Sequence, residues 1–163
     1  MIQVNNLHKS FGQEEILKGI NTQFYQGKTN LIIGQSGAGK TVFLKCLLGL
    51  FEPTEGTIEY NGKAYSSLDV EKQRALRQKM GMVFQGGALF DSMTIAENVM
   101  FPLRMFTKQK KSEMMDRVEE VLQRVNLENV NHKFPSEISG GMQKRVSIAR
   151  AIVNKPEYLF CDE

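Results

Sequence analysis

The segment Gly34-Gln35-Ser36-Gly37-Ala38-Gly39-Lys40-Thr41 constrains the fold of this chain more than any other feature of its sequence. It follows a short β-rich apolar run, Thr29–Ile33, and leads into Thr41–Leu48, which is apolar on most faces. This order predicts a strand, a glycine loop and a buried helix. A Gly-x-x-x-x-Gly-Lys-Thr pattern in that setting is typical of a P-loop, in which backbone N–H groups wrap phosphate groups.

Two side chains of such a loop have functions of their own. The Lys40 ammonium reaches the β and γ oxygens of a nucleotide, and the Thr41 hydroxyl ligates Mg²⁺. The alternative is an ordinary glycine-rich turn, which the strand before the loop and the helix after it disfavour. The residues expected to bind the nucleotide are therefore Gly34, Gln35, Ser36, Gly37, Ala38, Gly39, Lys40 and Thr41.

The N-terminal part of the chain has the pattern of half-exposed strands. Met1–Val4 and Gly19–Tyr25 alternate apolar and polar residues, which predicts antiparallel strands with a turn near Gly12. The dipeptide Asn61-Gly62 after Thr57–Tyr60 predicts a hairpin, because both residues readily adopt the positive φ angles of a tight turn.

Residues 86–137 are expected to form an α-helical insert of the domain. Thr94 has capping-box spacing and should begin a helix that falters around Pro102, and Ser112 should cap a second helix with one apolar face. Ser139, immediately before two glycines, is the expected cap of a further helix.

The remaining segments alternate between helix and strand. A polar helix is predicted over Val70–Lys79, a core strand over Met80–Phe84, and another strand over Tyr158–Cys161. We therefore expect one α/β domain over residues 1–163, of the P-loop NTPase type, with a mainly parallel sheet, an N-terminal antiparallel β part and an α-helical insert.

Two carboxylates follow the last predicted strand. Parallel sheets bind ligands at the carboxyl ends of their strands, where Asp162 and Glu163 should lie. Asp162 can hold Mg²⁺ through water, and Glu163 can polarise an attacking water. The alternative is a solvated strand end, which becomes the weaker interpretation in a chain that also has a P-loop.

The segment Ile138–Gln143 is a second candidate anion site. At the start of a helix, Ser139-Gly140-Gly141 can present backbone N–H groups and a hydroxyl to an anion. The alternative is a capped helix start whose basic residues, including Arg145 and Arg150, lie on the exposed face.

Composition restricts the class of partner. The chain has 163 residues and a net charge of +3, too small to indicate nucleic acid. It has no apolar run near the roughly 18 residues that cross a bilayer and no leader pattern, so we expect it to stay in the cytosol and to need a partner for membrane work. Cys46 and Cys161 are expected to be buried thiols.

With these motifs in order, the chain resembles the ATP-binding subunits of ABC transporters along essentially its whole length. Ile138–Met142 is similar to the family's Leu-Ser-Gly-Gly-Gln signature, with Met142 where the family often has glutamine. The aromatic Phe11, the P-loop, Gln85 at a strand end, the helical insert, the signature and the final acids follow in the family's order.

The resemblance implies roles for individual residues. It implies ATP and Mg²⁺ as ligands, Lys40, Gln85 and Glu163 as catalytic residues, and Thr41, Gln85 and Asp162 at the metal. It also implies that Phe11 stacks on adenine and that Gln85 reports nucleotide state to the membrane partner. From the residues alone, Phe11 can equally be a packing residue beside a turn, and Gln85 a polar residue at a strand end.

The resemblance further implies an assembly. Two such domains pair head to tail as a homodimer, and Ser139, Gly140 and Gly141 of one close over the γ-phosphate bound by the other. The partners implied are the permease subunits, on the cytoplasmic side of a bacterial inner membrane. In the family, further strands and a switch histidine follow the catalytic acid, so this chain resembles the N-terminal portion of the domain and is expected to bind ATP with little turnover.

A finer resemblance concerns the cargo. Phe84–Thr94, Phe101–Arg104 and Ser139–Met142 look like the Mla/Mce-associated branch, whose members move phospholipids or other lipids. The alternatives are an ABC ATPase for another cargo, such as lipoproteins or amino acids, a soluble ABC ATPase without a transport role, and a module that binds nucleotide without hydrolysis.

Overall fold

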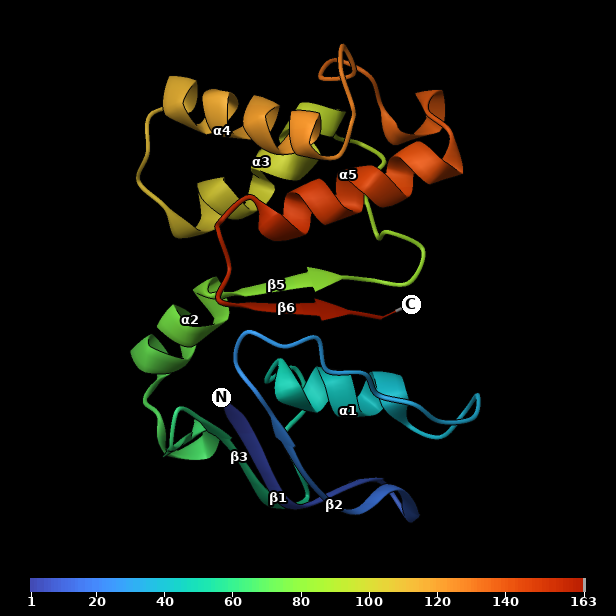
Figure 1. Cartoon of the computed structure of the whole chain (residues 1–163), viewed down its shortest axis with the longest axis vertical. Helices are drawn as coiled ribbons and strands as arrows, with labels where there is room; N and C mark the ends of the chain where they lie inside the picture. The colour runs from blue at the N-terminus through green and yellow to red at the C-terminus, as the bar shows by residue number, and fades with distance from the viewer. Residues whose placement is uncertain (163) are drawn as a thin grey trace. The chain divides into compact units, whose positions relative to one another are not determined.

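The computed structural model describes residues 1–162 and divides into two compact units, Met1–Arg77 and the part from Gln78 onward. Each unit has its own sheet (Figure 1). The first unit contains a four-stranded sheet in the order β2-β1-β3-β4, and the second a two-stranded sheet of β5 and β6.

The sheet of the first unit is antiparallel throughout, as the alternation in the sequence predicts. Its strands are β1 (Ile2–Phe11), β2 (Glu14–Phe24), β3 (Glu55–Tyr60) and β4 (Lys63–Ala64). β1 is central, because Ile2 pairs with Phe24 on one side and with Tyr60 on the other. Alternate residues of these strands form the core with helix α1 (Lys40–Leu47).

The predicted turns of this unit are confirmed. Gly12 has φ 61° between β1 and β2, and Asn61 and Gly62 have φ 50° and 77° in the hairpin between β3 and β4. A 3₁₀ turn (Tyr65–Ser67) and the polar helix α2 (Val70–Gln78) follow, the latter within one residue of its predicted range.

The prediction of a strand over Thr29–Ile33 is wrong for this structure. The segment is irregular, and Leu31 and Ile33 are 79% and 85% exposed. No strand of the first unit within the described residues pairs with it, and a strand exists only where a neighbour supplies ladder hydrogen bonds. The Asn30 amide meanwhile bonds the N–H and carbonyl of Tyr25, which closes a local turn.

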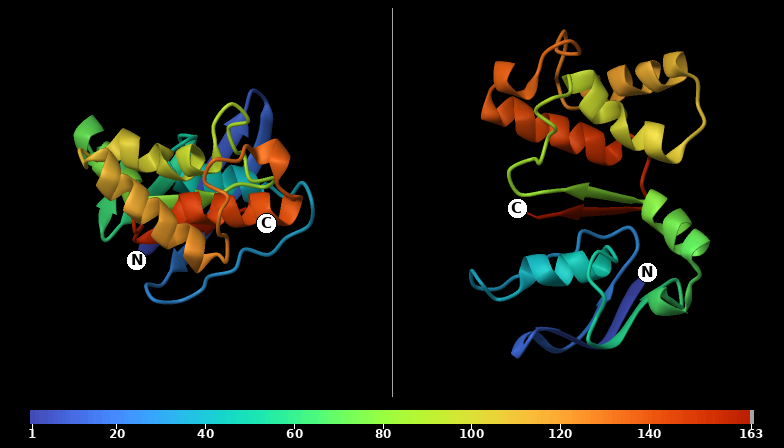
Figure 2. Two further views of the ribbon diagram at one scale, coloured as in Figure 1. Left: turned by 90° about the horizontal axis from the view of Figure 1, so that it is seen from above. Right: turned by 180° about the vertical axis from the view of Figure 1, so that it is seen from behind.

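The second unit combines the parallel pair β5 (Met80–Val83) and β6 (Tyr158–Cys161) with three helices. These are α3 (Ile95–Phe106), α4 (Lys111–Arg124) and α5 (Gly140–Ile152), and a 3₁₀ turn (Pro135–Glu137) precedes α5. Both figures show the three helices gathered on one side of the β5–β6 pair (Figures 1 and 2). Their facing apolar residues, with Val99, Val118, Val121 and Val146 fully buried, form the core.

Two details of the insert differ from expectation. Helix α3 continues through Pro102 to Phe106, because Val99, Met100 and Leu103 bury their side chains around the proline and offset the missing backbone hydrogen bond. Helix α4 begins at Lys111, so Ser112 lies inside its first turn; the Glu113 carboxylate accepts the Lys110 N–H at 2.9 Å and starts the helix earlier. The capping box at Thr94 is confirmed.

The two cysteines have different surroundings. Cys46 is buried in α1, as predicted, whereas Cys161 is exposed. Successive residues of a strand point to opposite faces, and in β6 the buried face is that of Phe160. In residues 1–162 no helix has both the length and the apolar character to span a membrane.

Arginines tie α4 and α5 together reciprocally. Arg117 of α4 donates from Nε and Nη2 to the carbonyls of Val153 and Ile152 where α5 ends, at 2.9 and 3.1 Å. Arg145 of α5 donates to the carbonyls of Val125 and Asn126 where α4 ends, at 3.3 and 2.8 Å. Cations are favourable at these negative helix ends.

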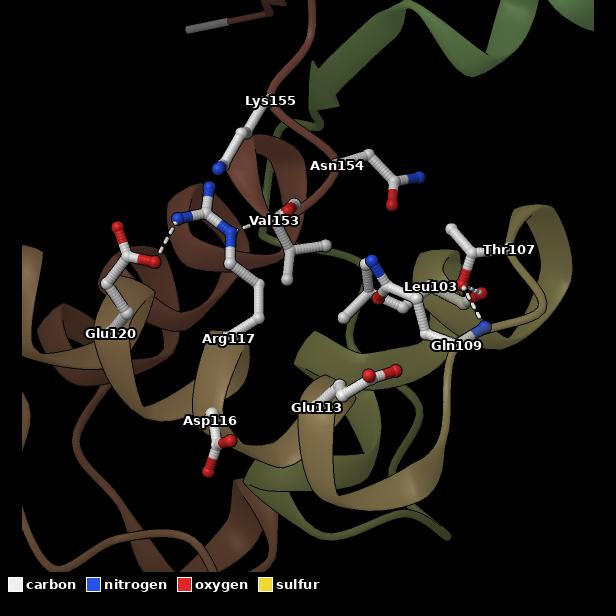
Figure 3. A pocket seen from close by; sticks show the side chains of 10 residues that line it. All are labelled: Leu103, Thr107, Gln109, Glu113, Asp116, Arg117, Glu120, Val153, Asn154 and Lys155. Carbon is white, nitrogen blue, oxygen red and sulfur yellow. Dashed lines mark hydrogen bonds and ion pairs between the residues drawn. The ribbon is translucent and has the colours of Figure 1, made fainter.

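Arg117 also lines a hollow of about 410 Å³ beside α3, α4 and the end of α5 (Figure 3). Figure 3 shows its guanidinium turned toward the Glu120 carboxylate, 2.6 Å away. None of the residues predicted to bind nucleotide lines this hollow.

Candidate functional site

The glycine loop of the first unit leads directly into α1. Gly39 is the residue before the helix and has the left-handed angles φ 87° and ψ 10°. A Cβ at Gly39 would lie 2.9 Å from Leu17 Cδ2 and 3.0 Å from Ile16 Cγ2. Position 39 therefore requires glycine both for its backbone angles and for its close approach to β2.

Lys40, the first residue of α1, bends back over the loop. Its Nζ donates to the carbonyls of Gly34 and Gln35, each at 2.9 Å, while Ala38 N–H closes a turn onto Gln35 at 3.2 Å. The ammonium, the loop and the positive end of α1 thus converge, with exposed Thr41 next to them. This arrangement can bind a nucleotide phosphate, because a lysine ammonium and the positive end of a helix lie beside the same loop.

Phe11 was interpreted either as a ring that stacks on adenine or as a packing residue beside a turn, and its surroundings have features of both. Its ring packs edge-on against Phe51 with centroids 5.3 Å apart, and Lys9 Nζ lies 4.9 Å from the ring centroid. Phe11 nevertheless remains 46% exposed, so part of the ring is available to a ligand. Its role in stacking on a base stays a prediction.

In the second unit, the parallel register of β5 and β6 brings two predicted site residues to one edge. Val83 pairs with Cys161, and the Asp162 N–H donates to the Val83 carbonyl at 3.0 Å. Gln85, two residues after β5, is exposed in a turn that the Gly87 N–H closes onto the Phe84 carbonyl at 2.9 Å. Gln85 and Asp162 therefore leave the sheet at the same edge. Glu163, the predicted water-polarising residue, lies outside the described residues.

The signature segment begins α5 as predicted. The Ser139 Oγ accepts the Met142 N–H at 3.3 Å, and Ile138 before it is buried in the helical core. Gly140 and Gly141 are exposed, and a Cβ at either would meet no atom within 4 Å. The local packing in the described residues therefore does not require glycine at either position.

The acidic residues in the first turns of three helices contrast with the two candidate phosphate sites. Helices α2, α3 and α4 carry Glu71, Glu97 and Glu113 in their first turns. Of the five α-helices in residues 1–162, only α1 and α5 have no acidic residue there. A carboxylate in the first turn would occupy the positive helix end and repel an anion.

Two buried polar residues of this region escaped the sequence analysis. The alternative interpretation of the signature segment placed Arg150 on an exposed face, but Arg150 is 8% exposed and its pKa is lowered by burial. Its position four residues after Val146 places it on the apolar stripe of α5, which is the signal that could have identified it. Asn98, fully buried in α3, had no comparable signal.

A glycine loop at a helix N-terminus, combined with a parallel strand pair that ends in acidic residues, defines the P-loop class of nucleotide-binding proteins. The family model described as "ABC transporter" matches residues 17–163. The match covers most of the chain, and the chain belongs to the ABC transporter family.

Curated relatives support this assignment. The chain is 44% identical over 162 residues to a "Probable ribonucleotide transport ATP-binding protein mkl" of Mycobacterium leprae, covering 99% of this chain and 47% of the relative. It is 41% identical to a "Methionine import ATP-binding protein MetN" of Clostridium tetani, covering 100% of this chain and 51% of the relative. The chain thus spans about half the length of the curated relatives it matches.

Solved structures agree with the fold. The ATP-binding cassette MJ0796, a dimer bound to ADP and Pi, matches with a TM-score of 0.90 and 33% identity, covering 100% of this chain and 74% of that one. The cbiO1 protein of Clostridium perfringens, part of the cbiONQ transporter complex, matches with a TM-score of 0.85 and 29% identity, covering 99% and 64%. The expected fold class, an α/β P-loop NTPase with antiparallel and parallel sheets, is confirmed.

Proposed function

We propose that this chain is the ATP-binding domain of an ABC transporter subunit and that it binds Mg·ATP through Gly34–Thr41. The observation that supports this most directly is the absence of acidic residues from the first turns of α1 and α5, whereas the other three α-helices of residues 1–162 each carry a glutamate in the first turn. Two helix ends are thereby kept positive for phosphate groups.

The two positive ends serve one nucleotide in a pair of copies. The loop before α1 binds the phosphates in its own copy, and Ser139, Gly140 and Gly141 of a second copy close over the γ-phosphate. The exposure of both glycines and the open space around them support a surface that meets a partner molecule. A dimeric cassette among the solved structures at 33% identity supports the same pairing.

Hydrolysis is assigned to residues at the edge of the parallel pair. Gln85 and Asp162, which leave β5 and β6 at the same edge, would hold Mg²⁺ and the attacking water, and Thr41 would supply a further ligand to the metal. A magnesium ion bound by these residues would offset the negative charge of the phosphate groups. Glu163 polarises the attacking water, Lys40 stabilises charge on the transferred group, and Phe11 packs on the adenine.

The proposed setting is the cytoplasmic side of a bacterial inner membrane, where the chain acts with permease subunits. We propose a phospholipid or other lipid as cargo, on the resemblance of Phe84–Thr94, Phe101–Arg104 and Ser139–Met142 to lipid transporters. Relatives named for ribonucleotide transport and methionine import favour a second candidate, a small polar cargo.

ATP binding is tested with a matched pair of lysine variants. Lys40→Ala should weaken Mg·ATP binding by about 100-fold or more, because it removes the ammonium that reaches the phosphates. Lys45→Ala removes the same group from the last turn of the same helix and should change affinity by less than about threefold. Titration calorimetry measures both, and equal effects of the two variants would contradict the P-loop assignment.

Hydrolysis and cargo need separate tests on the protein as its gene encodes it. Glu163→Gln should keep ATP binding, trap the ATP-bound pair and lower turnover by about 100-fold or more. Normal turnover by Glu163→Gln would show that Glu163 does not polarise the attacking water. A wild-type protein that binds ATP but does not hydrolyse it would favour the alternative of a module that binds nucleotide without hydrolysis. In the reconstituted transporter, stimulation of turnover by phospholipid, by methionine or by a ribonucleotide decides among the cargoes.

A further inference from the structure

Three arginines of the second unit each donate to two neighbouring backbone carbonyls. Arg117 and Arg145 bond the ends of α5 and α4, where unpaired carbonyls and the helix dipole require a cation. Arg150 is different. Its Nη1 donates to Ala88 O at 2.8 Å and its Nη2 to Gly87 O at 2.7 Å, and these carbonyls belong to a loop and not to a helix end.

Burying this arginine is costly. Arg150 is 8% exposed, and within residues 1–162 no carboxylate forms an ion pair with it. Besides the two carbonyls, the ring of Phe90, 6.0 Å from the Arg150 Cζ, stabilises the charge. A buried cation held by two loop carbonyls costs more than an apolar residue would, so stability does not explain its presence.

The loop that Arg150 holds is the one that presents Gln85. Gly87 contributes its carbonyl to Arg150 and its N–H to the turn that contains Gln85. Gly86, Gly87 and Ala88 have φ 74°, 80° and 46°, three consecutive left-handed residues. A Cβ on Gly87 would lie 3.7 Å from Gln143 O and from Ser147 Cβ, so the loop rests directly on α5.

The far end of the same loop is fixed to a different helix. Asn98 of α3 accepts the Phe90 N–H at 2.8 Å, and its amide donates to the carbonyls of Phe90, Met93 and Thr94 at 3.0 to 3.1 Å. The loop is therefore anchored on α5 at Gly87 and on α3 beyond Phe90. The attachment to α5 is the one nearest Gln85.

We propose that Arg150 is a positioning residue that couples the signature segment to Gln85. Ser139 caps helix α5, and Arg150 lies three turns further along it, so a movement of the signature toward ATP carries the Gln85 turn with it as one rigid piece. This inference rests on the proposed function, in which Gln85 acts at the metal and the attacking water and the signature segment closes over the γ-phosphate. Arg150 itself touches neither nucleotide nor water.

The test compares Arg150→Lys with Arg145→Lys in the protein as its gene encodes it. A lysine keeps the charge but cannot bond two carbonyls as a planar fork does. Each change weakens a pair of hydrogen bonds from an α5 arginine to two backbone carbonyls, so Arg145→Lys is the control for a general loss of stability. Arg150→Lys should lower kcat for ATP about tenfold or more while KM changes less than about threefold, because binding to the P-loop is unaffected. Arg145→Lys should leave both within about twofold.

Hydrogen exchange provides a readout independent of turnover. In Arg150→Lys, the amides of residues 86–88 should exchange about tenfold faster or more, whereas in Arg145→Lys they should keep their wild-type rates. Unchanged exchange in Arg150→Lys, or an equal fall in kcat in Arg145→Lys, overturns the proposal. If the wild type hydrolyses no ATP, the proposed function has failed, and exchange alone still decides whether Arg150 holds the loop.

Discussion

Helices α1 and α5 both begin with an exposed positive end, but they complete that end in different ways. Before α1, Gly39 is left-handed and has no side chain to offer, so the loop backbone and Lys40 are the groups that surround the helix start. Before α5, Ser139 is extended, at φ −67° and ψ 157°, and its own hydroxyl accepts the Met142 N–H. The start of α1 therefore has no side-chain cap from Gly39, whereas the start of α5 is capped by the hydroxyl of Ser139.

This difference suits the two roles proposed. A site that holds phosphate through the whole cycle gains from a backbone with no competing side chain. A surface that must approach and leave a nucleotide on another copy benefits from a cap that keeps the helix intact when nothing is bound. Substitutions at the two helix starts can separate these roles.

The largest effect is expected for Gly39→Ala. The left-handed angles and the contacts of 2.9 and 3.0 Å with Leu17 and Ile16 both oppose a Cβ. We expect the first unit to lose about 1–3 kcal/mol of stability and Mg·ATP affinity to fall about 100-fold or more. Thermal melting and calorimetric titration measure these changes, and retained affinity would mean that the loop backbone is not the phosphate site.

The next effect is expected at the serine cap. Ser139→Ala should cost about 1 kcal/mol, because the Met142 N–H loses its acceptor. Ser139→Asp separates folding from function, since aspartate caps equally well but places a negative charge where the γ-phosphate should arrive. Stability should therefore persist in Ser139→Asp while ATP turnover is lost. If Ser139→Asp turned over ATP normally, α5 would not face phosphate.

Gly141→Ala is the counterpart of Gly39→Ala with the opposite effect on folding. Its backbone is helical and its surroundings are open, so alanine should leave stability unchanged or raise it by up to about 1 kcal/mol. Binding of Mg·ATP to a single copy should change less than about twofold, while turnover by the pair falls. A loss of affinity as large as that of Gly39→Ala would remove the distinction between the two helix ends.

Features whose hydrogen bonds close within a few residues were predictable from the sequence. The Asn61-Gly62 turn, the Thr94 capping box and the Ser139 cap each depend on neighbours up to three residues away. The glycine loop before α1 was predictable for the same reason, since its turn and the Lys40 contacts lie within seven residues.

Features that depend on distant partners were not predictable. Thr29–Ile33 has the composition of a strand but lacks, within the described residues, the neighbour that a ladder requires. Arg150 donates to carbonyls that lie 62 and 63 residues away in the sequence. The apolar stripe of α5 indicates that Arg150 is buried, but no local pattern predicts which carbonyls it bonds. Helix α3 continues through Pro102, although the proline predicted that the helix would falter there. The burial of the residues around Pro102 depends on the packing of α3 against α4 and α5.

The smallest effect concerns a helix that has its own carboxylate, α3. Glu97 accepts the Thr94 N–H at 2.9 Å and the Thr94 hydroxyl at 3.1 Å, and these bonds hold the pKa of Glu97 below its ordinary value of 4.5. A lowered pKa in the folded state adds stability above pH 4.5, and this contribution is lost as pH falls through the folded-state value.

Glu97→Gln keeps an acceptor but removes the charge. Melting temperatures of wild type and Glu97→Gln should therefore differ at pH 7 and converge in acid, while Mg·ATP affinity stays the same. A pH-independent difference would assign the effect to the hydrogen bonds and not to the charge at the helix end.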